Sequence, residues 1–460
     1  MSLSIAKRGS FAHGIMADGL PLTPLEEYFF LEDRQAYPWS FFVRLDFSGR
    51  ADRQAAETAL GNCAVRHPLL SSVVQRHEDR QLTWRRVEGS APAVRWITGT
   101  PGKAYAPATR LDVSQEIGVR LHATVGQEGA QMIFQFNHAC CDGRGAFTLV
   151  EDWLVEYARA TGDLPDHGMT RTYDAGLLER RGRLGPDPRR PLVRFRAQLA
   201  GLARAYRFLA RSPAPLVDYQ PAHDDDPTPE GFPAARSHRF DEATTAEIRS
   251  AARCRGVTVN DLLCRDVLLA IHGFQREVRE RQPDVWLRLV VPVDLRTQSQ
   301  QNMSAANLVS LVFLTRRAGA CKDPAALLQS IHREMHQVKS WGLAHTFLRS
   351  LRIRKRLPGG LPHAVRSGKC QATAALTNVG ETLATCLLPR KGGRLVAGNL
   401  LLDAADVLAP IRPRTCASFA VCTYAGRLSV TLQYDPRGLS ETAADRLIDT
   451  FLRQVRSNTR

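Results

Sequence analysis

The stretch that most constrains the fold of this chain is residues 131–147, QMIFQFNHACCDGRGAF. Its apolar residues alternate at a period of two up to Phe136, which predicts a strand whose two faces differ. From Phe147 onward, apolar residues recur at helical spacing instead. The segment therefore predicts a strand, a tight turn and a helix, with His138 at the strand end and Asp142 at the helix entrance, where loops on a rigid support often carry chemistry.

Length and composition narrow the class of protein. The 460 residues are enough for two domains, and 44% hydrophobic with 23% charged residues is typical of a soluble globular protein. Charged residues interrupt the first twenty-two positions and no later apolar run reaches membrane-spanning length, so we expect a cytoplasmic protein. The 10 cysteines include no CxxC pair or Cys/His cluster, so neither a disulfide framework nor a metal site is predicted.

The formal net charge of +16 favours an anionic partner, which can be nucleic acid, a membrane, an acidic protein or a phosphate-bearing substrate. Nucleic acid is the weakest of these, because the sequence has no zinc-finger spacing, aromatic RNA-binding motif or basic tail. Solvated arginines account for much of the excess charge.

Strand and helix patterns divide the chain into a first subdomain at residues 1–165, a linker at 166–233 and a second subdomain at 234–460. Both subdomains mix strands with helices, which predicts an α/β fold. In the second subdomain SVTLQYDPRGLS repeats the order of strand, turn and helix seen at 131–147, without a histidine at the strand end. The other strands are predicted at 39–47, 69–74, 82–87, 117–125, 286–295, 309–314, 372–378, 394–401 and 417–424.

The linker contains an arginine-rich segment, residues 189–211, with apolar residues near helical spacing. These are Leu192, Phe195, Leu199, Leu202, Tyr206 and Leu209. One interpretation is a peripheral contact with a membrane surface or a carrier protein. We favour the other, a crossing helix that packs its apolar face on the body and keeps its arginines in solvent. The acidic run 224–226 is interpreted as solvated rather than as a metal site.

The string HACCDG, which holds His138, Asp142 and Gly143, fits an H-x-x-x-D-G motif. Here the chain resembles the chloramphenicol acetyltransferase-like superfamily, which includes condensation domains of peptide synthetases, wax ester synthases, plant acyltransferases and polyketide-associated mycobacterial acyltransferases. Four more stretches agree with this resemblance in the expected order: LTPLEEYFFLED, RHPLL, VTVNDLL, and PVDLRTQ followed by Asn307 and Leu308.

The chain also departs from individual branches of this superfamily. The DFGWG motif of the plant branch is missing, and the nearest late feature is TNVGE at 377–381. Asn137 stands where many members have a second histidine. These departures leave the branch, the acyl chain and the acceptor open.

The resemblance implies two similar subdomains with mixed sheets and a central tunnel, which donor and acceptor enter from opposite sides. It implies an acyltransferase in which His138 is the general base, a role that suits a group titrating near neutrality. The donor would be a thioester of coenzyme A or of a phosphopantetheine-bearing acyl carrier protein, acting as co-substrate with no bound cofactor. The acceptor would be a small alcohol or amine. Two alternatives are a free-standing, amide-forming condensation enzyme and a non-catalytic scaffold that binds carrier proteins.

Two roles are open for Asp142. It can orient the imidazole as in a catalytic triad, or, as the resemblance suggests and we prefer, it can pair with Arg296 and hold the loop in shape. Gly143 is then expected to provide backbone conformation rather than a contact. Asn307 is expected to support the site from the same part of the chain as Arg296.

The oxyanion of the reaction needs a hydrogen-bond donor, for which Thr377, Asn378 and a backbone N–H near Gly143 are candidates. Cys140 or Cys141 beside the histidine is a conceivable nucleophile, but we interpret both as buried apolar filler.

Overall fold

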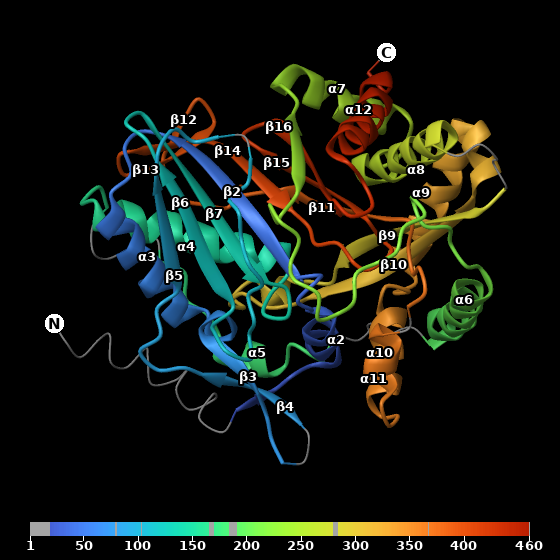
Figure 1. Cartoon of the computed structure of the whole chain (residues 1–460), viewed down its shortest axis with the longest axis horizontal. Coiled ribbons are helices and arrows are strands. Elements are labelled where there is room, and N and C mark those ends of the chain that lie inside the picture. The colour runs from blue at the N-terminus through green and yellow to red at the C-terminus, as the bar shows by residue number, and fades with distance from the viewer. Residues whose placement is uncertain are drawn as a thin grey trace.

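The computed structural model describes residues 19–78, 81–102, 104–164, 170–183, 191–278, 284–366 and 368–459, without the side chains of 191–197. Two large sheets, of seven and six strands, form the body, and a three-stranded sheet lies at its edge (Figure 1). Both large sheets contain parallel and antiparallel pairs. The predicted α/β fold with mixed sheets is therefore confirmed.

The seven-stranded sheet contains the strand predicted at the start of the 131–147 stretch. Its order is β12-β13-β14-β2-β7-β6-β5. The bounds are β2 Ser40–Ser48, β5 Ala93–Thr98, β6 Val119–Val125, β7 Gly129–Asn137, β12 Arg390–Lys391, β13 Arg394–Ala397 and β14 Leu400–Leu408. Helices α3 (Arg53–Arg66) and α4 (Gly143–Ala160) share one apolar core with it, in which Phe134 of β7 meets Trp153 of α4 edge to face.

Both faces of β7 are buried, but they differ in chemistry as the alternation predicted. Met132, Phe134 and Phe136 lie in the apolar core. On the opposite face, Gln135 donates to the Thr109 carbonyl at 2.8 Å and Asn137 donates to the Leu111 carbonyl at 2.8 Å. Amides are tolerated in this interior because their polar groups are paired.

The six-stranded sheet has the order β10-β9-β11-β15-β16-β8. Its strands are β8 Ala235–Arg239, β9 Trp286–Asp294, β10 Val309–Arg317, β11 Ala374–Glu381, β15 Ala417–Tyr424 and β16 Arg427–Tyr434. Four helices gather over this sheet (Figure 1): α7 Glu242–Cys254, α8 Val259–Val278, α9 Pro324–Ser340 and α12 Glu441–Ser457. They supply a second apolar core, separate from the first.

The remaining elements lie around the lower edge of Figure 1. They are β1 Leu20–Pro21, β3 Ser72–Arg76, β4 Leu82–Arg86, α2 Pro24–Glu32, α5 Ala175–Glu179, α6 Pro191–Ala210, α10 His345–Lys355 and α11 Gly360–Val365. Helix α2 begins where LTPLEE predicted, since the Thr23 hydroxyl accepts from the Glu26 N–H at 3.2 Å and the Glu26 carboxylate accepts from the Thr23 N–H at 2.9 Å.

Two segments from the second half of the chain cross to the first. Residues 390–408, which the sequence assigned to the second subdomain, form β12–β14 of the first sheet, with Leu408 opposite Phe42 of β2. The loop between β9 and β10 places Met303, Ala305 and Ala306 in the first apolar core. Local patterns indicate strands but not their partners, because pairing depends on which distant edge is available.

The prediction for the linker helix is wrong for the residues of α6 whose side chains the structure describes. Leu199, Leu202, Tyr206 and Leu209 are all exposed rather than packed on the body. The inward face is occupied instead by Arg204, which pairs with Glu334 at 2.8 Å, and by Phe208, whose ring lies 4.7 Å from that of Phe313. Leu192 and Phe195 have side chains outside the described set.

Candidate active site

His138 lies in the turn between β7 and α4, half-buried against three aromatic rings. Its backbone N–H donates to the Trp39 carbonyl at 2.9 Å, which fixes the turn to β2. Ring centroids of Phe29, Phe41 and Trp39 lie at 4.6, 4.9 and 6.0 Å from the imidazole. We call these three rings the aromatic wall. The ring atom Nδ1 is buried and has no hydrogen-bond partner among the described residues.

Burial sets the charge of this imidazole. The apolar surroundings lower the pKa of His138 from its ordinary value of 6.5, and the charge of Asp142 opposes this only in part. The ring is therefore neutral at pH 7 and available to accept a proton.

The Asp142 carboxylate is fully used by the scaffold. Arg296 donates to both its oxygens, at 2.8 and 2.9 Å, and the backbone N–H groups of Leu308 and Gly145 donate at 2.7 and 2.9 Å. Burial acts to raise the pKa of Asp142, but Arg296 and the two N–H groups outweigh it and hold the pKa below its ordinary value. The predicted pair with Arg296 is thus present, and no oxygen is left to orient the imidazole as in a triad.

The segment after β9 locks the turn from the other half of the chain. Arg296 also donates to the Ala306 carbonyl at 3.1 Å, and Asn307 donates to the carbonyls of His138 and Ala139 at 2.9 and 2.8 Å. Arg296 and Asn307 therefore reach the turn as predicted. They act on its backbone and on Asp142, and the Asn307 side chain also acts to raise the pKa of His138 against the effect of burial.

Asn137 and Asp33 complete the turn, and the sequence patterns did not single out either role. The Asn137 amide accepts from the Ala139 N–H at 2.9 Å and donates to Asp33 at 3.2 Å. Asp33 also accepts from the Trp39 N–H at 2.8 Å. Burial raises the pKa of Asp33 to about 6, against the lowering effect of Arg110. The sequence did offer a signal for the role of Asn137, because a polar residue stands beside the motif histidine where many members of the superfamily have a second histidine.

A second missed group is the buried pair of His67 and Asp152. His67 Nε2 lies 3.2 Å from the Asp152 carboxylate, and its Nδ1 accepts from the Ala305 N–H at 3.0 Å. Burial lowers the pKa of His67. This pair fastens the loop that carries Arg296 to the first core. Its sequence signal was the RHPLL stretch, which we used only as part of the family resemblance.

Gly143 does not have the role that we predicted. Its backbone is not in the left-handed region, so the turn does not require a glycine for conformation. A β-carbon here would stand 3.3 Å from a methyl group of Val379, so close packing is what limits its size. Gly145 is similar, with backbone atoms of Ala306 at 3.0 Å from the position of a β-carbon.

The same contact brings the end of β11 against the start of α4. Val379 follows Thr377 and Asn378, both half-buried, and the Asn378 side-chain oxygen accepts from the Gly380 N–H at 3.0 Å. The two predicted oxyanion candidates thus belong to the segment that borders the turn.

The neighbouring thiols are chemically quiet. Cys140 and Cys141 are fully buried, and this burial raises the pKa of both well above the ordinary thiol value. A protonated, buried thiol is a poor nucleophile. The interpretation of both as core residues is the one that the structure supports.

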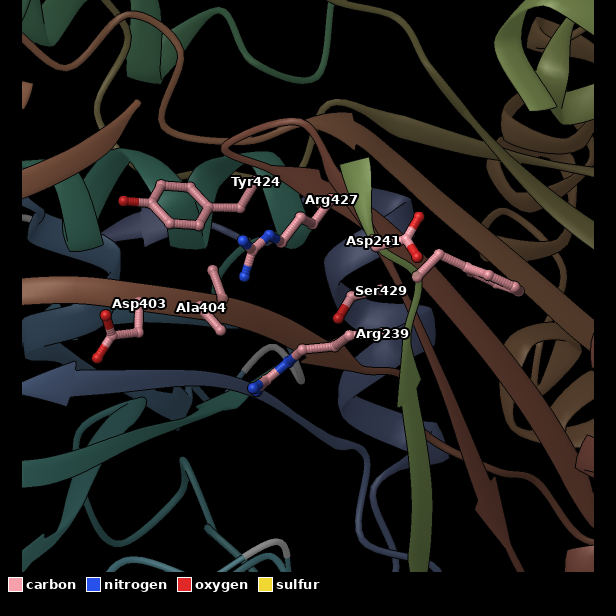
Figure 2. Close-up of a pocket in the computed structure, with 9 residues that line it drawn as sticks. Arg239, Asp241, Asp403, Ala404, Tyr424, Arg427 and Ser429 are labelled. Atoms are coloured by element: carbon pink, nitrogen blue, oxygen red, sulfur yellow. The ribbon is translucent and has the colours of Figure 1, made fainter. Parts of the chain in front are cut away.

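A cavity among the described residues lies elsewhere. It has a volume of about 380 Å³ and is lined by residues of β8, β14, β15 and β16, among them Arg239, Asp403 and Arg427 (Figure 2). The cavity residues Ala404 and Ala405 of β14 lie opposite Asp46 and Leu45 of β2. Ser40, which lies opposite Asn137 at the end of β7, is five to six residues further along β2. Along a strand this is about 17–20 Å. The central tunnel at His138 stays a prediction.

The charged residues around this cavity are already paired. Arg239 donates to Asp406 at 2.6 Å, Asp403 accepts from Arg394 at 2.6 Å, and Arg427 lies 3.3 Å from Glu242.

Among the described residues, no three metal-binding side chains cluster at any site. Asp224 of the acidic run pairs with Arg34 at 2.6 Å. No helix in the described ranges has the length and apolar content needed to cross a membrane.

Comparison with solved structures identifies the fold. The chain is similar to polyketide synthase associated protein 5 from Mycobacterium tuberculosis, with a TM-score of 0.61, 17% identity, and 94% of this chain and 97% of that chain covered. For the first condensation domain of the CDA synthetase the TM-score is 0.68, with 14% identity and 96% of each chain covered. For trichothecene 15-O-acetyltransferase from Fusarium sporotrichioides it is 0.68, with 12% identity, 95% of this chain and 94% of that chain.

The chain therefore has the fold that these condensation and acyltransferase structures share, and its H-x-x-x-D-G turn lies between β7 and α4. More particularly, residues 229–433 match the family described as "Phthiocerol/phthiodiolone dimycocerosyl transferase C-terminus". No curated protein matches the chain significantly in sequence.

Proposed function

We propose that this protein transfers an acyl group from a thioester of coenzyme A or of an acyl carrier protein to an alcohol or amine, with His138 as general base. One observation carries the proposal. The imidazole has a lowered pKa and an Nδ1 with no hydrogen-bond partner among the described residues, and its backbone is anchored by Trp39 and by Asn307, which come from different halves of the chain. A fixed, neutral base of this kind suits proton abstraction.

The reaction needs one proton transfer in each direction. As the acceptor oxygen or nitrogen bonds to the thioester carbonyl carbon, its proton passes to His138. When the tetrahedral intermediate collapses, the C–S bond breaks and the thiolate takes that proton from the imidazolium. No covalent enzyme intermediate and no bound cofactor is required, because the thioester already activates the acyl group.

The other residues of the site position His138 or stabilise charge. Asp142, Arg296 and Asn307 hold the turn, and Thr377 or Asn378 is proposed to donate a hydrogen bond to the oxyanion. Removing one donor of this kind typically costs about 10²–10³ in rate. The net charge of +16 supports an anionic donor, whether the phosphates of coenzyme A or an acidic carrier protein. We propose the cytoplasm as the site of the reaction.

A panel of acyl-coenzyme A and acyl-carrier donors with alcohol and amine acceptors tests the proposal, with thiol release and product mass as readouts. His138→Ala should slow transfer by about 10²–10⁴-fold, whereas the matched control His122→Gln should not. His122 lies on β6 of the same sheet and makes one hydrogen bond, to Gln135 at 3.1 Å. Transfer by His138→Ala at the wild-type rate would contradict the proposal.

The products separate the alternatives. Amide formation without ester formation would make the protein a free-standing condensation enzyme. Binding of a carrier protein with no transfer from any donor would favour a non-catalytic scaffold. Tight nucleic-acid binding that weakens steeply with salt would favour a third class, driven by charge.

A further inference from the structure

Helix α6 turns its apolar side chains toward solvent, whereas an ordinary surface helix buries them. Its outward face carries four large apolar side chains between 54% and 73% exposed: Leu199, Leu202, Tyr206 and Leu209. Their spacing of three, four and three residues places them on one side of the helix. We call them the α6 face. Single exposed apolar residues are common on proteins, but a continuous row of them marks an interaction surface.

The inward face explains why α6 cannot simply turn over. Gly201 is buried against Thr346 of α10, whose hydroxyl is 3.4 Å from the position of a β-carbon. Arg204 forms an ion pair with Glu334 of α9 at 2.8 Å. At the last turn, Arg288 donates to the Phe208 carbonyl at 2.9 Å, and its guanidinium lies 4.2 Å from the centroid of that ring. These contacts fix the helix with the α6 face outward.

Helix α10 continues the same kind of surface. It lies next to α6 at one edge of the molecule (Figure 1), in contact through Gly201 and Thr346. Ile353 of α10 is 61% exposed, and Leu357, just beyond its end, is 56% exposed. Arg349, Lys355 and Arg356 beside them are exposed as well.

Both segments are basic and contain no acidic residue. Residues 188–217, which include α6, have seven arginines and no Asp or Glu. Residues 335–380, which include α10, have eight Lys or Arg and again no Asp or Glu. Exposed apolar residues flanked by cations, with no anion among them, are the combination that binds an anionic membrane surface.

We propose that the α6 face and the exposed part of α10 dock on an anionic lipid bilayer, with the apolar side chains at the boundary between headgroups and acyl chains. A second copy of this chain is a poorer occupant, because it would bring two arginine-rich surfaces together. An acidic protein would satisfy the charges but would not by itself account for the row of apolar side chains. The proposal does not rest on acyl transfer.

Vesicle flotation tests it without any substrate. The wild-type protein should float with vesicles of phosphatidylcholine that contain phosphatidylglycerol, and much less with phosphatidylcholine alone. The double variant Leu202→Glu/Leu209→Glu should bind at least about tenfold more weakly, with unchanged thermal unfolding because both side chains are exposed. The matched control is Leu387→Glu, since Leu387 is 68% exposed but lies outside α6 and α10.

A charge variant gives an independent measurement. Arg349→Gln/Arg356→Gln should weaken binding to the anionic vesicles by about fivefold for each charge removed, and added salt should weaken it further. Equal binding by the Leu202→Glu/Leu209→Glu variant would overturn the proposal, as would binding to neither kind of vesicle. Loss of a dimer in that variant, or binding of an acidic carrier protein but of no vesicle, would assign the surface to a protein partner instead.

Discussion

Two parts of this molecule have the same local plan, a strand, a tight turn and a helix, but only one has the features of an active site. In β7–α4 the first residue after the strand is His138, and in β16–α12 it is Asp435. Asp435 is fully buried, and its carboxylate accepts hydrogen bonds from Arg437 at 2.7 Å and from the Tyr219 hydroxyl at 3.2 Å. The Nδ1 atom of His138 has no such partner among the described residues.

The residues that cap the two helices also differ in how far along the chain their hydrogen-bond partners lie. Ser440 caps α12 by accepting from the Ala443 N–H of that helix at 3.2 Å. Asp142 caps α4 but also binds Arg296 and the Leu308 N–H, which belong to the other half of the chain. The cap of α4 is thus shared with a distant segment of the chain, whereas the cap of α12 is local.

The largest expected effect separates the two residues at the strand ends. His138→Ala should lower the turnover rate by about 10²–10⁴-fold, because the proton of the acceptor then has no positioned base. Asp435→Asn should leave the rate of the folded protein unchanged and lower the midpoint of chemical denaturation, because Arg437 loses a charged partner. Steady-state rates beside denaturation curves measure both. If Asp435→Asn lost activity while keeping its stability, the contrast between the two turns would be wrong.

The second effect concerns the caps. Asp142→Ala and Arg296→Ala should each lower the free energy of unfolding by about 3 kcal/mol, because each removes the bidentate partner of a largely buried charge. Ser440→Ala should cost about 1 kcal/mol, the usual value for a lost helix cap. Urea denaturation of the single and double variants checks this. The double variant should lose much less than the two single losses combined. Additive losses would show that the pair does not act as a unit.

A third, smaller effect compares the glycines of the two turns. A β-carbon at Gly438 would meet three atoms of the Tyr219 ring at 3.0–3.2 Å, whereas one at Gly143 would meet a single Val379 methyl at 3.3 Å. A rigid ring yields less than a methyl group, so Gly438→Ala should cost about 1–3 kcal/mol and Gly143→Ala less than that. Thermal unfolding of the two variants ranks them. The reverse order would mean that the turn of β7 is the more tightly packed one.

The smallest effect is the pH dependence of the proposed reaction. Since the pKa of His138 lies below 6.5, the base is already neutral above that pH, and kcat/KM should change by less than about twofold between pH 6.5 and 8. The acid limb should fall below pH 6.5. An acid limb with its midpoint above pH 6.5 would assign the proton transfer to a different group.

His138 and Asp142 both make the free energy of unfolding depend on pH, and both contributions are lost as the pH falls. The unfolded chain binds a proton at His138 more readily than the folded chain, so its contribution is present above about pH 6.5 and lost as the pH falls. Asp142 also has a lowered pKa, so the stability of its ion pair is present above about 3.8 and lost as the pH falls through its folded value. The loss of stability between pH 7 and 3 should therefore be smaller in His138→Ala and in Asp142→Ala than in the wild-type protein, as denaturation curves would measure.

Much of the candidate site could be predicted from the sequence because its parts are local or carry a motif. The alternation of β7 and the HACCDG string placed His138 at a strand end and Asp142 at a helix start. The pair of Asp142 with Arg296 followed from the resemblance alone, since no local pattern links residues so far apart. The role of Gly143 was predicted wrongly, because the neighbour that limits its size, Val379, belongs to a distant strand.

By itself, the sequence determined most of the longer strands and the capping box of α2, since these follow from periodicity and from hydrogen bonds within a few residues, but it predicted no strand at β5 or β8. Only the tertiary structure decided which distant segments meet. It put residues 390–408 into the first sheet, brought Arg296 and Asn307 onto the turn of His138, and left the apolar side of α6 in solvent. Periodicity shows that a helix has an apolar face. Which face is buried depends on the partners that the rest of the chain provides. At α6, contacts with Glu334, Phe313 and Thr346 bury the face that carries Arg204, Phe208 and Gly201 instead of the apolar one.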